Sequence, residues 1–268
     1  MMLCLLVGLA IRQEAPERTE AIYRMPASEA SSPRFRELLD DEFDTLCVDP
    51  APNASIRATV GKKLAFIEAK LLDTAANRKW RDATIDFANG KISPKAWVAR
   101  TSKLHETVHW LSNPNTPNLR EATPSQTADP TYSGRSVFAE MLLLAWPGRP
   151  CLTSTDCWLT RDLPDAGRLQ SWVLAMNDWR GPMLSFRHDR PEMAHGPIQV
   201  LRADGKPGLL IVHLGKKGKG MTLYFNNSQH SVDGGKIDPE KVLPMGNGLD
   251  MDAAKPSVRS LGMVILPD

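Results

Sequence analysis

Cysteine is scarce in this chain, with four residues among 268 at irregular spacing. No two of them form the Cys-x-x-Cys pair that is typical of zinc ribbons and thiol redox centres. A secreted disulfide scaffold has more cysteines in a shorter chain, so we expect reduced thiols and an intracellular protein. We also expect Cys151 and Cys157 to be inert packing residues.

The chain also carries little net charge and no long apolar run. Its 33 basic and 31 acidic residues leave a formal charge of +2, which gives no reason to expect a nucleic-acid partner. The apolar stretch at residues 1–10 is too short to span a bilayer, so we expect no membrane partner. This stretch has no basic start, and it fits a buried strand as well as a signal peptide. A buried strand there would mean that the chain begins inside a domain.

Hydrophobic patterning divides the chain into two parts. Residues 1–195 alternate helix-like and strand-like segments, which predicts an α/β architecture. Residues 196–268 contain four β-like runs separated by Gly, Asn, Asp and Lys turns, which predicts a small antiparallel domain. These runs are residues 198–201, 209–214, 221–225 and 261–266. The basic tetrapeptide at residues 216–219 lies between two of them, where an exposed hairpin tip is expected.

One local string would name a chemistry without any other evidence. Ser93 can cap a helix and Pro94 suits its first position, and apolar residues then recur at helical spacing, so we predict a helix over residues 93–113. His105 and His109 would share one face of that helix and could bind one Zn²⁺, with Glu106 polarising a bound water. This is the pattern of a zinc peptidase.

The zinc hypothesis needs a third ligand from elsewhere in the sequence. Asp129 and Glu140 are the acidic candidates, and Asp129 begins a segment that resembles the Asp-x-x-Tyr-Gly element of aspzincin peptidases. Lys103 counts against the hypothesis, because such helices prefer an uncharged residue there. Chance is the simpler interpretation of the string.

Several segments, in order, resemble a different family, the α-amylase-type glycoside hydrolases (family 13), nearest the isoamylase or debranching branch. The segment FRHDRPEMAHG at 186–196 resembles the last barrel helix of these enzymes. The segment MTLYFNNSQHS at 221–231 resembles a strand and turn of the domain that follows. Residues 77–90, 97–104, 108–119, 140–152 and 260–268 are similar to further family segments in the same order.

The resemblance implies a fold and a set of site positions. It implies a partial (β/α)-barrel half over residues 1–195 and a C-terminal antiparallel β-sandwich over residues 196–268. The family's nucleophilic Asp would fall near Gly8 and its neighbouring Arg near Leu6. The acid would correspond to Glu68, and the stabilising Asp would be replaced by Asn115. A retaining glycosidase needs paired carboxyl groups, so these replacements predict a degenerate catalytic site.

The resemblance therefore implies a pseudoenzyme of starch or glycogen debranching that needs no cofactor. The family includes a non-catalytic plant isoamylase subunit of this kind, which supports a catalytic subunit in a hetero-oligomer. The expected partners are an α-glucan and a catalytic isoamylase, and the plant reading would place the chain in the plastid stroma. A zinc metallopeptidase is the alternative from another class. A gene fragment without independent function is the third, and an open half-barrel would aggregate.

Overall fold

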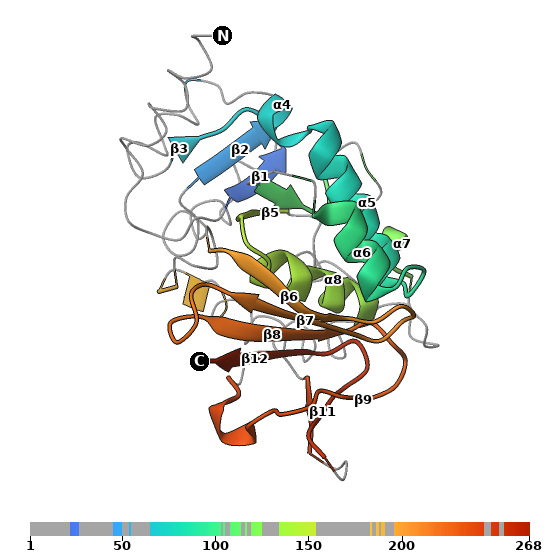
Figure 1. The fold of residues 1–268 in the computed structure, drawn as a ribbon. Helices are drawn as coiled ribbons and strands as arrows, with labels where there is room; N and C mark the ends of the chain where they lie inside the picture. Colours follow the sequence, from blue (N-terminus) through green and yellow to red (C-terminus); the bar gives the residue numbers. More distant parts are fainter. Residues whose placement is uncertain are drawn as a thin grey trace, which may run out of the picture.

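The computed structural model describes the chain in segments that form a mixed α/β protein (Figure 1). These segments are residues 22–26, 45–49, 54, 65–102, 104, 108–113, 116, 119–124, 134–153, 183, 186–187, 189–190, 196–243, 248–251 and 255–268. A parallel sheet with flanking helices comes first in the sequence, and antiparallel sheets follow it. The apolar stretch at residues 1–10, which fits a buried strand, lies outside the described residues.

The parallel sheet has five strands in the order β3-β2-β1-β5-β4. They are β1 (Ile22–Pro26), β2 (Thr45–Asp49), β3 (Ala65–Phe66), β4 (Val108–Trp110) and β5 (Arg149–Thr153). Strand β5, which comes last of the five in the sequence, pairs in parallel with β1, which comes first. This is the cyclic strand order of a barrel, open between β3 and β4 in the part of the chain that the structure describes.

Both faces of this sheet are buried, as expected for parallel strands. Ile22, Cys47, Trp110 and Cys151 form an apolar cluster on one face. Alternate residues, among them Tyr23, point to the opposite face and join the large core beneath the helices. The sheet therefore has an inner face, defined by the cluster around Ile22, and a helix-covered outer face.

Among the described residues, five α-helices accompany these strands, and the two longest cover the outer face. They are α4 (Ala69–Leu72), α5 (Ala75–Ala88), α6 (Pro94–Thr101), α7 (Leu119–Ala122) and α8 (Gly134–Ala145). The predicted start of α6 is confirmed, because the Ser93 hydroxyl oxygen accepts a hydrogen bond from the Ala96 amide at 3.2 Å. Thr74 caps α5 in the same way, with its oxygen 3.1 Å from the Asn77 amide.

The predicted helix over residues 93–113 is wrong in its second half. Helix α6 ends at Thr101, and residues 108–110 form strand β4. Strand β4 pairs with β5, which places Trp110 beside Cys151 in the inner-face cluster. Burial of that face outweighs the local helical spacing.

The antiparallel part confirms the four predicted β runs. Its larger sheet has the order β12-β8-β7-β6, built from β6 (Ile198–Ala203), β7 (Leu209–Leu214), β8 (Met221–Asn226) and β12 (Met263–Pro267). The smaller sheet contains β9 (Val232–Asp233), β10 (Leu249–Asp250) and β11 (Ser257–Val258), and a short 3₁₀ helix, η3 (Pro239–Lys241), precedes β10. Residues 216–219 are exposed between β7 and β8, as expected.

The larger antiparallel sheet contributes to two cores. One face, including Phe225, packs against Trp97 and Phe138 in the large core that also covers the parallel sheet. Helix α8 accordingly lies between the parallel and antiparallel sheets (Figure 1). The opposite face carries Tyr224, which packs with Val258 of the smaller sheet. Among the described helices, none is long and apolar enough to cross a membrane.

Candidate functional site

Charged and polar side chains gather where the parallel strands end. Arg24 lies in β1, Asp49 is the last residue of β2, and Asn113 follows β4 by three residues. Asp73 is the C-cap of α4, which follows β3. The carboxyl ends of parallel strands meet at one edge, where barrel enzymes place their sites. We call these four residues the carboxyl-edge cluster.

Arg24 holds the cluster together. Its Nε donates to Asp49 Oδ2 at 2.7 Å, and its Nη2 lies 2.6 Å from the same oxygen. Its Nη1 donates to Asp73 Oδ1 at 2.7 Å and its Nη2 to Asp73 Oδ2 at 2.9 Å. Asn113 adds a third donor to Asp73, with Nδ2 3.0 Å from Oδ1. Asp73 therefore accepts hydrogen bonds on both oxygens.

The cation of the cluster is buried, and its two carboxylates are partly exposed. The Arg24 side chain is 2% exposed, whereas those of Asp49 and Asp73 are 25% and 16% exposed. Burial by itself lowers the pKa of Arg24, but the hydrogen bonds and charges of Asp73 and Asp49 raise it above its usual value. One cation and two carboxylates leave a formal charge of −1 facing solvent.

The backbone carbonyl of Leu72 fixes the position of Asp73. It accepts a hydrogen bond from Asn77 Nδ2 at 2.7 Å and another from Trp110 Nε1 at 2.8 Å. Asn77 belongs to α5 and Trp110 to β4, and both side chains are fully buried. Two elements thus converge on the residue before Asp73, which gives the cluster a rigid support.

Cys47 lies beneath the cluster on the inner face, and its chemistry is suppressed there. Burial raises the pKa of its thiol to about 12, so the thiolate is absent at neutral pH. Cys47 and Cys151 are both free and buried. The expectation that Cys151 is a packing thiol agrees with this placement.

Glu68, the expected acid, lies away from the cluster's hydrogen bonds. It precedes α4, its side chain is 65% exposed, and its Oε2 is 2.6 Å from Lys70 Nζ. An exposed pair of this kind contributes little to stability. The structure places Glu68 in a surface ion pair, and the carboxyl groups that it brings together are those of Asp49 and Asp73.

His109 does not occupy the helix face that the zinc hypothesis requires. It lies in β4 on the helix-covered face, and its ring stacks on Trp80 with centroids 4.4 Å apart. Burial lowers its pKa to about 4; a hydrogen bond with the Pro147 backbone opposes the shift, and the charge of Arg187 adds to it. Its Nδ1 is buried without a hydrogen-bond partner. The residue is therefore a neutral packing imidazole at neutral pH.

The other expected site residues divide into buried and undescribed positions. Glu140 is 0% exposed within α8. Asn115, His105, Glu106 and Asp129 lie outside the described residues, as do residues 6 and 8. Within the residues that the structure describes, no group of three or more His, Cys, Asp or Glu side chains could hold a metal ion.

Sequence reasoning missed the carboxyl-edge cluster. No motif in the sequence singles out Arg24 or Asp49. The one available signal was an apolar run that ends in Asp-Pro at Asp49. The contacts of Arg24 span 25 and 49 residues, a separation that local patterns do not report.

The chain matches no protein-family model. It also matches no curated protein sequence.

Solved structures of amylase-type enzymes do share its fold. The Nostoc punctiforme debranching enzyme aligns with a TM-score of 0.55 and 15% identity over 90% of this chain and 63% of its own. The cyclic α-maltosyl-(1→6)-maltose hydrolase from Arthrobacter globiformis aligns with a TM-score of 0.52 and 18% identity over 87% of this chain and 57% of its own. The α-amylase from H. orenii aligns with a TM-score of 0.52 and 12% identity over 84% of this chain and 61% of its own.

These similarities establish an amylase-type fold and no more, because the identities are low. The chain spans about 57% to 63% of the length of these structures. The predicted sequence of a partial barrel and a β domain thus agrees with their fold.

Proposed function

We propose that this chain is a glucan-binding protein of the debranching type that does not hydrolyse glycosidic bonds by the family's double displacement. The proposal rests on one observation: Asp49 and Asp73, the two carboxylates of the carboxyl-edge cluster, both bind the buried Arg24 within an amylase-type fold. The proposal requires no metal or other cofactor.

Glucan binding follows from the position and chemistry of the cluster. Barrel-type proteins bind their ligands at the carboxyl ends of the strands. Asp49 and Asp73 are partly exposed there, and carboxylate and amide groups such as that of Asn113 are suited to hydrogen bonding with sugar hydroxyls. The cluster thus offers several fixed polar groups on a rigid base.

The absence of turnover follows from what the two carboxyl groups already contact. Retaining glycosidases need one carboxyl group to attack the sugar and a second to donate a proton. Here Asp73 accepts on both oxygens, and Asp49 Oδ2 accepts from Arg24 Nε and forms an ion pair with its Nη2. The strongest bonds these groups can make are therefore made within the protein, so the cluster serves binding better than bond cleavage.

The proposal extends to a partner and a location. A glucan-binding chain without turnover acts by holding substrate for an active enzyme, so we propose a catalytic isoamylase as its partner in a hetero-oligomer. The protein would then work inside the cell where starch or glycogen is made. In a plant or alga this place is the plastid stroma.

Affinity electrophoresis in native gels containing amylopectin tests glucan binding, with a reducing-end assay on the same protein. We expect retarded migration and no release of reducing ends. Asp49→Asn should weaken the retardation, because it removes one charge from the cluster with little change in shape. Glu240→Gln, on the exposed surface of η3, is the matched control and should migrate like the wild type.

Co-purification with a catalytic isoamylase tests the partner. A protein that binds neither glucan nor isoamylase would overturn the proposal as a whole. Release of reducing ends that is lost in both Asp49→Asn and Asp73→Asn would instead show that the cluster is catalytic.

A further inference from the structure

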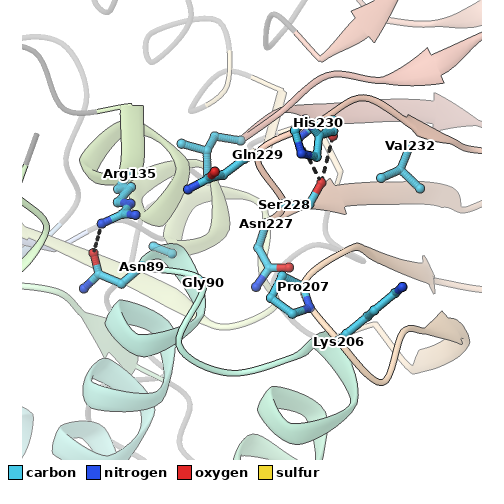
Figure 2. A pocket seen from close by; sticks show the side chains of 12 residues that line it. Asn89, Gly90, Arg135, Lys206, Pro207, Asn227, Ser228, Gln229, His230 and Val232 are labelled. Atoms are coloured by element: carbon cyan, nitrogen blue, oxygen red, sulfur yellow. Dashed lines mark hydrogen bonds between the residues drawn. The ribbon is translucent and has the colours of Figure 1, made fainter. Parts of the chain in front are cut away.

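Two neighbouring turns of the antiparallel part are held by different chemistry. The β6–β7 turn is held by Asn227 (Figure 2), whose Oδ1 accepts from the Gly208 amide at 2.8 Å and whose Nδ2 donates to the Phe87 carbonyl at 3.0 Å. These groups are neutral amides, so their bonds do not depend on a titration. The β7–β8 turn at residues 215–220 is held instead by a carboxylate and an imidazole, which both titrate.

Asp268, which directly follows β12, is the acceptor that holds this turn. Its Oδ2 accepts from the Gly218 amide at 2.6 Å and from the Gly220 amide at 3.1 Å. Its own amide donates to the Gly220 carbonyl at 3.2 Å. His213 Nε2 lies 3.0 Å from Oδ1 and 3.1 Å from Oδ2. Strand β7, the turn and the end of β12 therefore meet at one carboxylate.

Two glycines allow the turn to approach this carboxylate. Gly218 has a φ of +80°, in the left-handed region that favours glycine. A side chain at Gly220 would clash with the Leu214 carbonyl oxygen and with the His213 ring. Both amides can therefore point at one anion, as in the backbone concavities that bind anions in proteins.

The charged groups around His213 lie on the turn and at the end of β12. The turn carries three exposed lysines, Lys216, Lys217 and Lys219. On the adjacent strands His213 is paired with Gln199 of β6 and Thr222 of β8, which are neutral. Helix α6 packs on the opposite face of β7, that of Val212. Asp268 is thus the acid that His213 contacts.

Asp268 is held in its charged form. Burial by itself raises its pKa, but hydrogen bonds from His213 and from the Gly220 and Gly218 amides lower it below its usual value, and the charge of His213 adds to this effect. No other charged side chain of the described residues, those of the smaller sheet and the turn lysines included, is among these causes. Asp268 therefore stays a carboxylate while an imidazole takes up a proton.

Protonation of His213 converts a neutral hydrogen bond into an ion pair. Charge-assisted hydrogen bonds are stronger than neutral ones. The side chains of His213 and Asp268 are 13% and 18% exposed, so water screens the pair only in part. The contact should thus strengthen as the pH falls through the range in which imidazoles titrate, about pH 8 to 5. It should weaken again at lower pH, where Asp268 itself takes up a proton.

We propose that His213 and Asp268 form a pH-sensitive latch that fixes the lysine-bearing β7–β8 turn to the end of β12. The latch is looser above neutral pH and tighter in weak acid. It sets how firmly the three exposed lysines of the turn are held in place.

Amide hydrogen exchange of the full chain, followed by NMR, tests the latch. At about pH 5.5 the Gly218 and Gly220 amides should exchange about threefold more slowly in the wild type than in His213→Gln, whose side chain can donate a hydrogen bond but cannot titrate. At about pH 7.5 the two proteins should exchange alike. A positive charge by itself speeds base-catalysed exchange, so slower exchange reports the hydrogen bonds of the turn.

Two further variants complete the test. Asp268→Asn should speed exchange of both amides and remove their dependence on His213. Asp233→Asn is the matched control, because the Asp233 carboxylate also binds a glycine amide, that of Gly235 at 2.7 Å, without an imidazole. It should release Gly235 and leave the β7–β8 turn unchanged.

Equal exchange in the wild type and His213→Gln at about pH 5.5 would overturn the proposal. Unchanged exchange of the Gly218 and Gly220 amides in Asp268→Asn would overturn it as well. The inference does not rest on the proposed glucan function, because exchange is measured without a glucan.

Discussion

At the scale of single residues, Arg24 and His109 show opposite ways of burying an ionisable group. Arg24 stays charged because two carboxylates lie within 2.6–2.9 Å of its guanidinium. His109 has a ring face on Trp80 and loses its charge, because no carboxylate compensates burial among the causes that set its pKa. A buried charge persists only where partners and hydrogen bonds replace water.

Replacing Arg24 should be strongly destabilising. Arg24→Met removes one partner of a largely buried network and leaves Asp49 and Asp73 facing each other, so we expect a loss of about 3 kcal/mol in the free energy of unfolding. Urea denaturation measures it. Arg100→Met is the control, because the exposed Arg100–Asp86 pair should contribute less than about 0.5 kcal/mol. Equal losses in the two variants would contradict this account of the network.

Stability should fall as the pH drops toward 4, in part because of His109. The folded-state pKa is about 4 and the unfolded value is about 6.5, so above pH 6.5 neither state binds the proton. Between pH 6.5 and 4 the unfolded state binds a proton that the folded state does not. The depressed pKa therefore gives stability at neutral pH that is lost on acidification, by up to about 3 kcal/mol.

His109→Phe isolates this contribution. Phenylalanine keeps the ring stack on Trp80 but cannot titrate, so the difference in unfolding free energy between pH 7 and pH 4 should be smaller than in the wild type. Urea denaturation at several pH values measures the slope. An unchanged slope in His109→Phe would refute the assignment.

At the scale of elements, local signals determined where helices begin, and long-range burial determined where they end. Ser93 and Pro94 start α6 as the sequence predicts. Helical spacing continues past Thr101, yet the chain turns and residues 108–110 become β4. An N-cap is a contact within three residues, whereas a strand depends on a partner that can lie 41 residues away, as β5 does from β4.

The cap of α6 gives a direct test at this scale. Ser93→Ala leaves the Ala96 amide without its side-chain acceptor, so we expect a loss of about 1 kcal/mol in the free energy of unfolding. Ser93→Asp restores an acceptor and should recover most of that loss. Both follow from urea denaturation. A loss in Ser93→Asp as large as in Ser93→Ala would show that the cap bond is not what stabilises the start of α6.

At the scale of the whole molecule, the two parts of the chain share one core. Phe225 of β8 lies against Phe138 of α8 with ring centroids 6.4 Å apart, and both are fully buried. The antiparallel sheet is thus one wall of the core that covers the parallel sheet. Much of the apolar face of the β part would be exposed in a fragment of residues 196–268, and such a fragment should not unfold cooperatively.

Asn227 tests the connection between the two parts. Asn227→Ala removes the donors to Phe87 and Ile92 and the acceptor for Gly208, so several buried polar groups lose their partner. We expect a loss of about 3 kcal/mol in the free energy of unfolding. Faster amide hydrogen exchange near Gly208 should accompany it. Gln229→Ala, two residues away and exposed, should change neither quantity.

The sequence by itself determined the elements whose causes are local. These are the start of α6, the four β runs after residue 196, the exposed turn at residues 216–219 and the packing role of Cys151. The order of its segments also indicated the amylase-type fold that the structural comparisons support.

Only the tertiary structure decided the sites. The carboxyl-edge cluster joins residues 25 to 49 positions apart, and Asn227 binds the end of α5 from more than a hundred residues later in the chain. The sequence predicts His109 on a helix beside His105. Strand pairing instead places it in β4, where its neutral ring stacks on Trp80. Strand pairing and shared burial act between distant segments, and one sequence window contains only one side of each contact.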